Sequence, residues 1–155
     1  MLPEGFRVEV FAASFPNPTS MAFAPDGTLY VSLEGGLILA LQDSDGDGSA
    51  DSIVQVGGDF VAPLGLAFHD GALYVSSRGR VDAMRDTDDD GMFDEIEEII
   101  SDLPVKGSHQ NNGLAFGPDG KLYMNVGSTC NACIERDERN ATIMQFNADG
   151  TDGVV

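Results

Sequence analysis

The chain has 155 residues, with 26 acidic against 8 basic side chains and a formal net charge of −18. This charge excludes nucleic acids and anionic membrane surfaces as partners, because both bind to a basic face of a protein. No apolar run reaches the roughly 18 residues of a membrane-spanning helix, and the 42% hydrophobic content with 19 glycines predicts one folded, turn-rich β domain over residues 1–155.

The chain begins with "MLPEGFRVEVF", which lacks the basic start and the apolar core of a signal peptide. We therefore expect that the sequence itself does not carry the information about export.

Three segments of the chain resemble one another. They are "PTSMAFAPDGTLYVSL" (18–33), "PLGLAFHDGALYVSS" (63–77) and "NNGLAFGPDGKLYMNVG" (111–127). The matched Phe23, Phe68 and Phe116 are 45 and then 48 residues apart. Each segment has two short apolar strands around an Asp-Gly pair, which is a strong signal for a tight hairpin turn.

Further strand-like sequence follows each hairpin. It occupies residues 36–42, 52–58, 79–85, 95–101 and 141–153. Four strands in a period of roughly 45 residues are typical of a propeller blade. The sequence therefore predicts an all-β propeller with about three four-stranded blades, at approximately 6–58, 59–104 and 105–155. A β-sandwich of hairpins is the alternative, although a sandwich does not require internal self-similarity.

Three blades make half of a six-bladed ring, whereas closed propellers have about 4–8 blades. An open ring leaves sheet faces and edges that proteins normally protect. We expect that either a second copy of the chain or a missing C-terminal half closes the ring. The end at "GTDGVV", just after a hairpin turn, favours the missing half.

Two acidic loops share one pattern, "DSDGDGSAD" (43–51) and "DTDDDGMFD" (86–94). Both read D-x-D-x-D-G-x-x-D, which brings hard oxygen ligands together in a tight loop and suits Ca²⁺. The strand-like flanks distinguish the loops from EF-hands, and a solvated acidic turn is the alternative. Calcium here would tie two strand ends together and offset charge repulsion. The predicted ligands are the carboxylates of Asp43, Asp45, Asp47, Asp51, Asp86, Asp88, Asp90, Asp94 and Glu97 and the carbonyls of Ser49 and Met92.

The chain has two cysteines, Cys130 and Cys133, in "CNAC". No histidine follows the second cysteine, which excludes covalent haem attachment, and no second pair is present for a four-cysteine zinc site. A local disulfide in an exported protein is the first interpretation. A reduced redox pair or two free thiols are the alternatives.

The stretch "HQNNGLAFGPDGKLYMNVG" (109–127) resembles the H-Q-x-x-G/L…G-P-D-x-K-L/I-Y-x-x-x-G stretch of quinoprotein sugar dehydrogenases. These are the glucose and sorbosone dehydrogenase-type six-bladed β-propellers. The opening "LPEGFRVEVFA" and "NPTSMAFAPDGTLYVS" also resemble the first blade of that family. The resemblance covers essentially the whole chain and the N-terminal half of such a domain. It implies pyrroloquinoline quinone (PQQ) and Ca²⁺ as cofactors, a sugar substrate, and an extracellular or periplasmic location.

By this resemblance His109 is the general base that takes the proton of a sugar hydroxyl while a hydride moves to PQQ. An unperturbed imidazole has a pKa of about 6.5, so its neutral form is available near pH 7. The candidate cofactor contacts are Gln110, Asn111, Asn112 and Ser128.

The sequence departs from the family pattern in three ways. Ser128 stands where the glucose enzymes tend to carry an Asp that orients the His. The loop before "LGLAFHD" lacks their quinone-approaching glutamine, and the basic residues that hold the cofactor's carboxylates belong to the other half. An inert polar residue at a channel is therefore the alternative for His109. His69, in "AFHDG", is expected to be a turn residue only.

Three functions remain open. The first is a PQQ-dependent sugar dehydrogenase-like domain with structural calcium, incomplete on its own. The second is a non-catalytic, calcium-stabilised propeller module for binding or assembly. The third is a lactonase-like hydrolase, for which Glu34 is the one obvious carboxylate.

Overall fold

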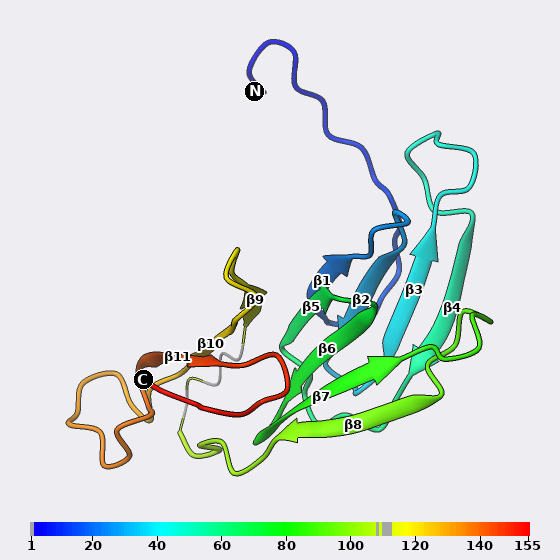
Figure 1. Cartoon of the computed structure of the whole chain (residues 1–155). Helices are drawn as coiled ribbons and strands as arrows, with labels where there is room; N and C mark the ends of the chain where they lie inside the picture. Colours follow the sequence, from blue (N-terminus) through cyan, green and yellow to red (C-terminus); the bar gives the residue numbers. More distant parts are fainter. Residues whose placement is uncertain (1, 108, 110–112) are drawn as a thin grey trace.

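The computed structural model describes residues 2–107, 109 and 113–155, and every helix or strand found among them is a β-strand (Figure 1). The strands form three antiparallel sheets in chain order, which confirms the predicted all-β class. Within these residues no helix has the length and apolar character needed to cross a membrane. The first sheet contains β1 (Pro18–Phe23), β2 (Leu29–Leu33), β3 (Ile38–Gln42) and β4 (Ser52–Gly57). The second contains β5 (Gly65–His69), β6 (Ala72–Ser77), β7 (Arg80–Arg85) and β8 (Glu95–Ile100), and the third β9 (Leu114–Phe116), β10 (Leu122–Val126) and β11 (Thr142–Phe146).

The hairpins form where the Asp-Gly pairs predict them. In the first, Asp26 Oδ1 accepts the backbone N–H of Thr28 at 2.9 Å, and Gly27 donates its N–H to the carbonyl of Ala24 at 3.0 Å. Gly27 has a φ of 92°, which a residue without a Cβ adopts at little cost. The turn chemistry therefore sets the pairing of β1 with β2.

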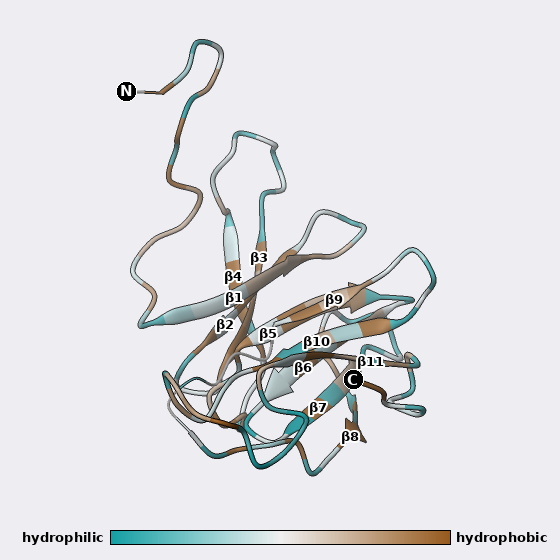
Figure 2. Cartoon of the chain, turned by 90° about the vertical axis from the view of Figure 1, so that its left-hand side faces the viewer, coloured by the Kyte–Doolittle hydropathy of each residue, from teal (hydrophilic) through white to brown (hydrophobic). Residues whose placement is uncertain are grey.

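The inner strands of the three sheets lie side by side. β1 lies against β5, and β5 lies against β9, as the edge-on view in Figure 2 shows. Each sheet then extends outward from its inner strand, one strand after another. This is the arrangement of neighbouring blades in a propeller.

A buried apolar core joins the first two sheets. Ile38, Leu73 and Met84 are fully buried in it. The ring of Tyr30 stacks on that of Phe68, with 6.0 Å between their centroids. Full burial of one large apolar side chain stabilises a fold by about 1.5–3 kcal/mol, so this core fixes the angle between the two blades.

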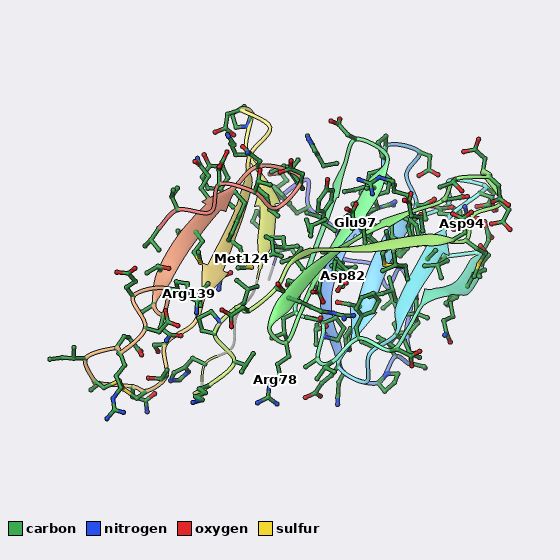
Figure 3. All side chains as sticks on the ribbon, turned by 60° about the horizontal axis from the view of Figure 1, so that its bottom comes forward. Arg78, Asp82, Asp94, Glu97, Met124 and Arg139 are labelled. Atoms are coloured by element: carbon green, nitrogen blue, oxygen red, sulfur yellow. A yellow bond between two sulfur atoms is a disulfide. The ribbon has the colours of Figure 1, made fainter. Side chains whose placement is uncertain are left out.

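A second core joins the second and third sheets. Leu122 and Met124 are buried in it against Tyr74, and Met124 lies between the two sheets in Figure 3. His69 also belongs to this contact, because its ring stacks on Phe116 with 4.0 Å between the centroids. His69 thus ends β5 and packs two inner strands together, in addition to preceding the turn.

The third sheet differs from the prediction of four-stranded blades. It has three strands, and an isolated bridge pairs Gln145 of β11 with Val154. Gln145 and Val154 exchange two backbone hydrogen bonds of 2.8 and 2.9 Å. The pairing therefore begins at the position of a fourth strand.

The outer face of the first sheet remains partly open. Met21 and Phe23 are 70% and 65% exposed there, although residues 11–15 cover part of the same face. The segment before them leaves the sheets altogether (Figure 1), and its alternating Phe6 and Val8 are exposed. Large apolar side chains are thus exposed on this face and along the N-terminal segment.

The loops of the three sheets gather at two opposite ends. The turn end contains the β1–β2, β3–β4, β5–β6, β7–β8 and β9–β10 connections. The linker end contains the connections between sheets and the β2–β3, β6–β7 and β10–β11 connections. In Figure 1 the β3–β4 loop and the β9–β10 turn point upward, whereas the β8–β9 linker and the β10–β11 loop lie at the bottom.

Candidate functional site

His109 lies at the linker end, between β8 and β9, and is partly buried. Its Nε2 is 2.6 Å from Oδ1 of Asn131, which is in the β10–β11 loop. The predicted cofactor contacts Gln110, Asn111 and Asn112 lie outside the described residues. Within the described part of the chain, the imidazole is thus within hydrogen-bond distance of the side-chain amide of Asn131, which the sequence pattern did not single out.

Ser128, the fourth predicted cofactor contact, lies in the same loop as Asn131. Its Oγ donates to the backbone carbonyl of Cys130 at 3.0 Å. The hydroxyl thus closes a local turn, and the contact found for His109 is made by Asn131 instead. The signal that could have found Asn131 is its position between the two cysteines.

Cys130 and Cys133 are joined as a disulfide in the structure. A second tie closes the same loop, because the carboxylate of Glu135 accepts the N–H and the hydroxyl of Thr129, each at 2.7 Å. The loop that carries Asn131 is therefore cross-linked both covalently and by hydrogen bonds.

A cavity of about 660 Å³ lies beside this loop, between residues 102–106 and 129–140. Lys106, Arg136 and Arg139 line it. Arg139 is engaged, since it donates to both oxygens of Asp137 at 3.0 and 2.7 Å, and these bonds lower the pKa of Asp137 to about 2. Among the described residues Lys106 and Arg136 form no ion pair. Asp102 and Asp137 also line the cavity, so its charged lining consists of three basic and two acidic side chains.

Glu34 also lies at the linker end, directly after β2. Its Oε2 accepts the side-chain amide of Asn17 at 3.0 Å. The carboxylate groupings close enough to hold a metal, as far as the described chain goes, do not include it. The structure thus gives no support to Glu34 as a calcium ligand of a lactonase-like site.

The two acidic loops lie at the turn end and have the same internal geometry. In the first, Asp43 Oδ2 accepts the N–H of Gly48 at 2.9 Å. In the second, Asp86 Oδ2 accepts the N–H of Gly91 at 2.8 Å. The aspartate at position 1 therefore closes both loops onto the glycine at position 6, as the repeated pattern predicts.

The aspartate at position 9 also has one role in both loops. Asp51 accepts the N–H and the hydroxyl of Ser44, each at 2.7 Å, and Asp94 accepts those of Thr87 at 2.9 and 2.6 Å. These bonds, the one from the hydroxyl first, hold the pKa of Asp51 and of Asp94 below its usual range. The aspartate at position 9 therefore ties the start of each loop to its end.

Three carboxylates of each loop approach one another to within 4.8 Å. They are Asp43, Asp45 and Asp51 in the first loop and Asp86, Asp88 and Asp90 in the second. Repulsion by Asp90 is the largest cause that raises the pKa of Asp88. Crowded carboxylates at this distance favour a divalent cation among them.

The remaining predicted ligands lie beside these groups. Asp47 accepts the N–H of Ser49 at 2.8 Å, and Asp90 accepts that of Met92 at 2.8 Å. Glu97 is 3.6 Å from Arg85 in an exposed ion pair on the second sheet, and Figure 3 shows it well along β8 from Asp94. In the first loop the structure gathers the carboxylates at positions 1, 3 and 9, and in the second those at positions 1, 3 and 5. Asp47, Asp94 and Glu97 are outside these two groups.

The chain matches one protein family over residues 1–152, described as "Domain of unknown function (DUF7133)". It belongs to that family. No curated protein matches the sequence.

Several solved structures share the fold. The PQQ domain of pyranose dehydrogenase from Coprinopsis cinerea has a TM-score of 0.82 at 17% identity, over 96% of this chain and 38% of that one. A calcium structure of the family AA12 carbohydrate-active enzyme from Trichoderma reesei has a TM-score of 0.81 at 19% identity, over 97% and 40%. The PQQ-bound aldose sugar dehydrogenase from Streptomyces coelicolor has a TM-score of 0.74 at 22% identity, over 92% and 48%.

These comparisons confirm the expected resemblance at the level of the fold. The chain has the fold of the PQQ-dependent sugar dehydrogenase propellers and spans 38–48% of the length of these solved chains. The predicted half-propeller is thus supported by its strand order and by the share of each related chain that it covers.

Proposed function

We propose that this chain is the half-propeller part of a quinoprotein sugar dehydrogenase, with His109 as the general base. The observation that carries the proposal is the position of His109 at the linker end, on a fold shared with PQQ-dependent sugar dehydrogenases. In this proposal, a sugar hydroxyl approaches the imidazole and the ring of blades around it excludes water.

The chemistry of the linker end suits an anionic quinone. Arg78, Lys106 and Arg136 lie on its loops, and no ion pair engages them within the described chain. Arg78 reaches the β8–β9 linker, since its Nη2 donates to the carbonyl of Val105 at 3.4 Å. Guanidinium and ammonium groups are the usual partners of carboxylates, so these side chains would add to the basic residues that the resemblance places in the other half, and Ser128 stays a further candidate contact of PQQ.

His109 would then accept the hydroxyl proton of the sugar on one ring nitrogen. A base whose pKa lies near the working pH combines sufficient strength with a sufficient neutral fraction. When bound, PQQ supplies the acceptor for the hydride from the sugar carbon. The protein's own contribution is to orient the sugar, to remove the hydroxyl proton and to stabilise the imidazolium that results.

The two acidic loops form the second part of the proposal, as structural Ca²⁺ sites. They are supported by the equivalent hydrogen bonds in both loops and by the approach of three carboxylates within 4.8 Å in each. Each loop joins two adjacent strands, so an ion there would hold the outer part of a blade together.

The rest of the ring forms the third part. The exposed Met21 and Phe23 and the coverage of 38–48% of related chains support further blades that close the propeller, from a missing C-terminal half or from a second copy. Light scattering of this chain at about twice its 16.4 kDa mass would favour the second copy, and a monomer would exclude it. We propose an extracellular or periplasmic location, supported by the disulfide.

A non-catalytic, calcium-stabilised binding module is the second candidate. The observation that favours it is the engagement of Ser128 with Cys130, away from His109. One experiment separates the two functions. The closed ring that contains this chain is reconstituted with PQQ and Ca²⁺, dye reduction is measured with a panel of aldoses, and His109→Ala is the matched variant. Turnover that His109→Ala abolishes supports the dehydrogenase, whereas no turnover and no absorbance change of PQQ would leave the binding module.

A further inference from the structure

The contact between His109 and Asn131 joins two segments that are far apart in the sequence. His109 precedes β9, whereas Asn131 follows β10, and 2.6 Å separate Nε2 of the imidazole from Oδ1 of the amide. An amide oxygen only accepts hydrogen bonds, so the nitrogen facing it carries the proton. In the neutral imidazole Nδ1 is then the basic nitrogen.

The segment that carries Asn131 is held more tightly than an ordinary loop. Asn131 is between the two cysteines of the disulfide. On either side, Ser128 donates to the carbonyl of Cys130, and Glu135 accepts two hydrogen bonds from Thr129. Cross-links on both sides reduce the freedom of the amide, which is the requirement for an orienting group.

We propose that Asn131, presented by the Cys130–Cys133 loop, is the positioning residue of His109. It takes the place in which the resemblance suggested an acid at position 128. The inference rests on the proposed function of His109 as a base, but the contact itself is testable without any quinone. The proposal also assigns a structural role to the disulfide, which is to hold the amide of Asn131 against the imidazole.

The proposal has an electrostatic consequence because the amide is neutral. A carboxylate at position 131 would face the imidazole directly and stabilise its protonated form. The other charged groups are Asp102 and Lys106 on the linker and Glu135, Arg136, Asp137, Glu138 and Arg139 on the loop, and Arg139 is paired with Asp137 and with Asp102. Glu135 is already bonded to Thr129, and the described residues include no ion pair of His109.

The test is nuclear magnetic resonance of the imidazoles in the 155-residue chain, which has two histidines. His69, stacked on Phe116, serves as the internal reference. Long-range ¹H–¹⁵N spectra report which nitrogen of His109 carries the proton. We expect the proton on Nε2, and an Nδ1–H tautomer would overturn the proposal.

Two variants then place the same charge at neighbouring positions of the loop. Asn131→Asp puts a carboxylate against His109, and Ala132→Asp puts it one residue further. We expect Asn131→Asp to raise the pKa of His109 by about one unit, a tenfold change in its ionisation constant, and Ala132→Asp to change it much less. Equal shifts in the two variants would refute a direct contact.

The role of the disulfide is tested in the same spectra. The double change Cys130→Ser and Cys133→Ser frees the loop, so the extra shift caused by Asn131→Asp should fall to the level of Ala132→Asp. A thermal melt followed by circular dichroism confirms that each variant is folded. An undiminished shift without the disulfide would contradict its holding role.

The failures of the two proposals can be told apart. If the closed ring that contains this chain does not turn over aldoses with PQQ, the dehydrogenase proposal fails, while the spectra of the 155-residue chain still decide the contact. If turnover occurs and Asn131→Asp neither shifts the pKa of His109 nor moves the acid limb of the pH–rate profile, only the positioning role fails.

Discussion

Calcium removal is the most direct test of the two acidic loops. Each loop gathers three carboxylates within 4.8 Å, and the equivalent position-1 and position-9 hydrogen bonds already close both loops. Binding that selects the folded state at a ligand concentration of about 100 Kd stabilises a protein by about 2.7 kcal/mol per site. At this chain length each kcal/mol of added stability raises the melting midpoint by about 2–4 °C. Each occupied loop should therefore raise the midpoint by roughly 5–10 °C.

A single substitution in the second loop sharpens the test. Asp88 lies within 4.8 Å of Asp86 and Asp90, so Asp88→Asn removes both a calcium ligand and a repelling charge. We expect the variant to melt at or slightly above the wild-type temperature in EDTA, since water screens the repulsion between exposed charges. In millimolar Ca²⁺ it should melt several degrees below the wild type.

Asp89→Asn is the matched control, because it removes the same charge at position 4, where no ligand is expected. The backbone φ of Asp89 is 60°, a conformation that Asn also adopts readily. The assay is a thermal melt followed by circular dichroism in EDTA, Ca²⁺ and Mg²⁺. An unchanged midpoint between EDTA and Ca²⁺, or equal effects of Asp88→Asn and Asp89→Asn in Ca²⁺, would refute the calcium sites and leave solvated acidic turns.

Three further predictions concern the scaffold. Leu122 is fully buried between the second and third sheets, so Leu122→Ala should lower the free energy of unfolding in urea by about 2–5 kcal/mol. Ile143 is 66% exposed, so Ile143→Ala should lower it much less. Equal losses in the two variants would contradict the packing. Burial raises the pKa of Asp82, so the folded state binds the extra proton and stability falls as pH rises from the unfolded value of about 3.9 through the raised one. Asp82→Asn should therefore lose less stability than the wild type between pH 4 and pH 7, measured by urea unfolding, and an equal loss would speak against the burial effect. Gly36→Ala places a Cβ against a backbone carbonyl of the β4–β5 linker, whereas the Cβ of Gly27→Ala meets nothing within 4 Å at a similar positive φ. Thermal melts should show Gly36→Ala to be less stable than Gly27→Ala by about 1 kcal/mol or more. Equal stabilities would exclude the close approach at Gly36.

The strands could be predicted from the sequence because two local signals agree in every repeat. The Asp-Gly pair sets the hairpin turn, and alternating apolar residues assign the faces of the strands. Phe68 illustrates the second signal, since it pairs with Leu73 on the face that packs against the first sheet. The incomplete third sheet was not predicted, because residues 141–153 contain a turn after β11 and only Val154 pairs beyond it.

The candidate site was predictable only where one segment contains the whole pattern. Each acidic loop is continuous, so its spacing predicts both its closure on glycine and the approach of its carboxylates. Asn131 was missed because its contact with His109 spans two loops of the third repeat. Glu97 was assigned to a loop by spacing alone, whereas strand pairing brings it to Arg85.

The acidic loops lie at the turn end and His109 lies at the linker end, so calcium bound in the loops would be too far from a quinone beside His109 to contact it. Strands of five or six residues separate the turn end from the linker end, at about 3.3 Å per residue. At the linker end, Glu34, Glu135 and Asp137 are already bonded to neighbouring side chains. An ion beside His109 would therefore need a set of ligands separate from the two acidic loops. It follows that Ca²⁺ binding at the loops should be measurable in this chain without any quinone, and that the two kinds of calcium can be separated by experiment.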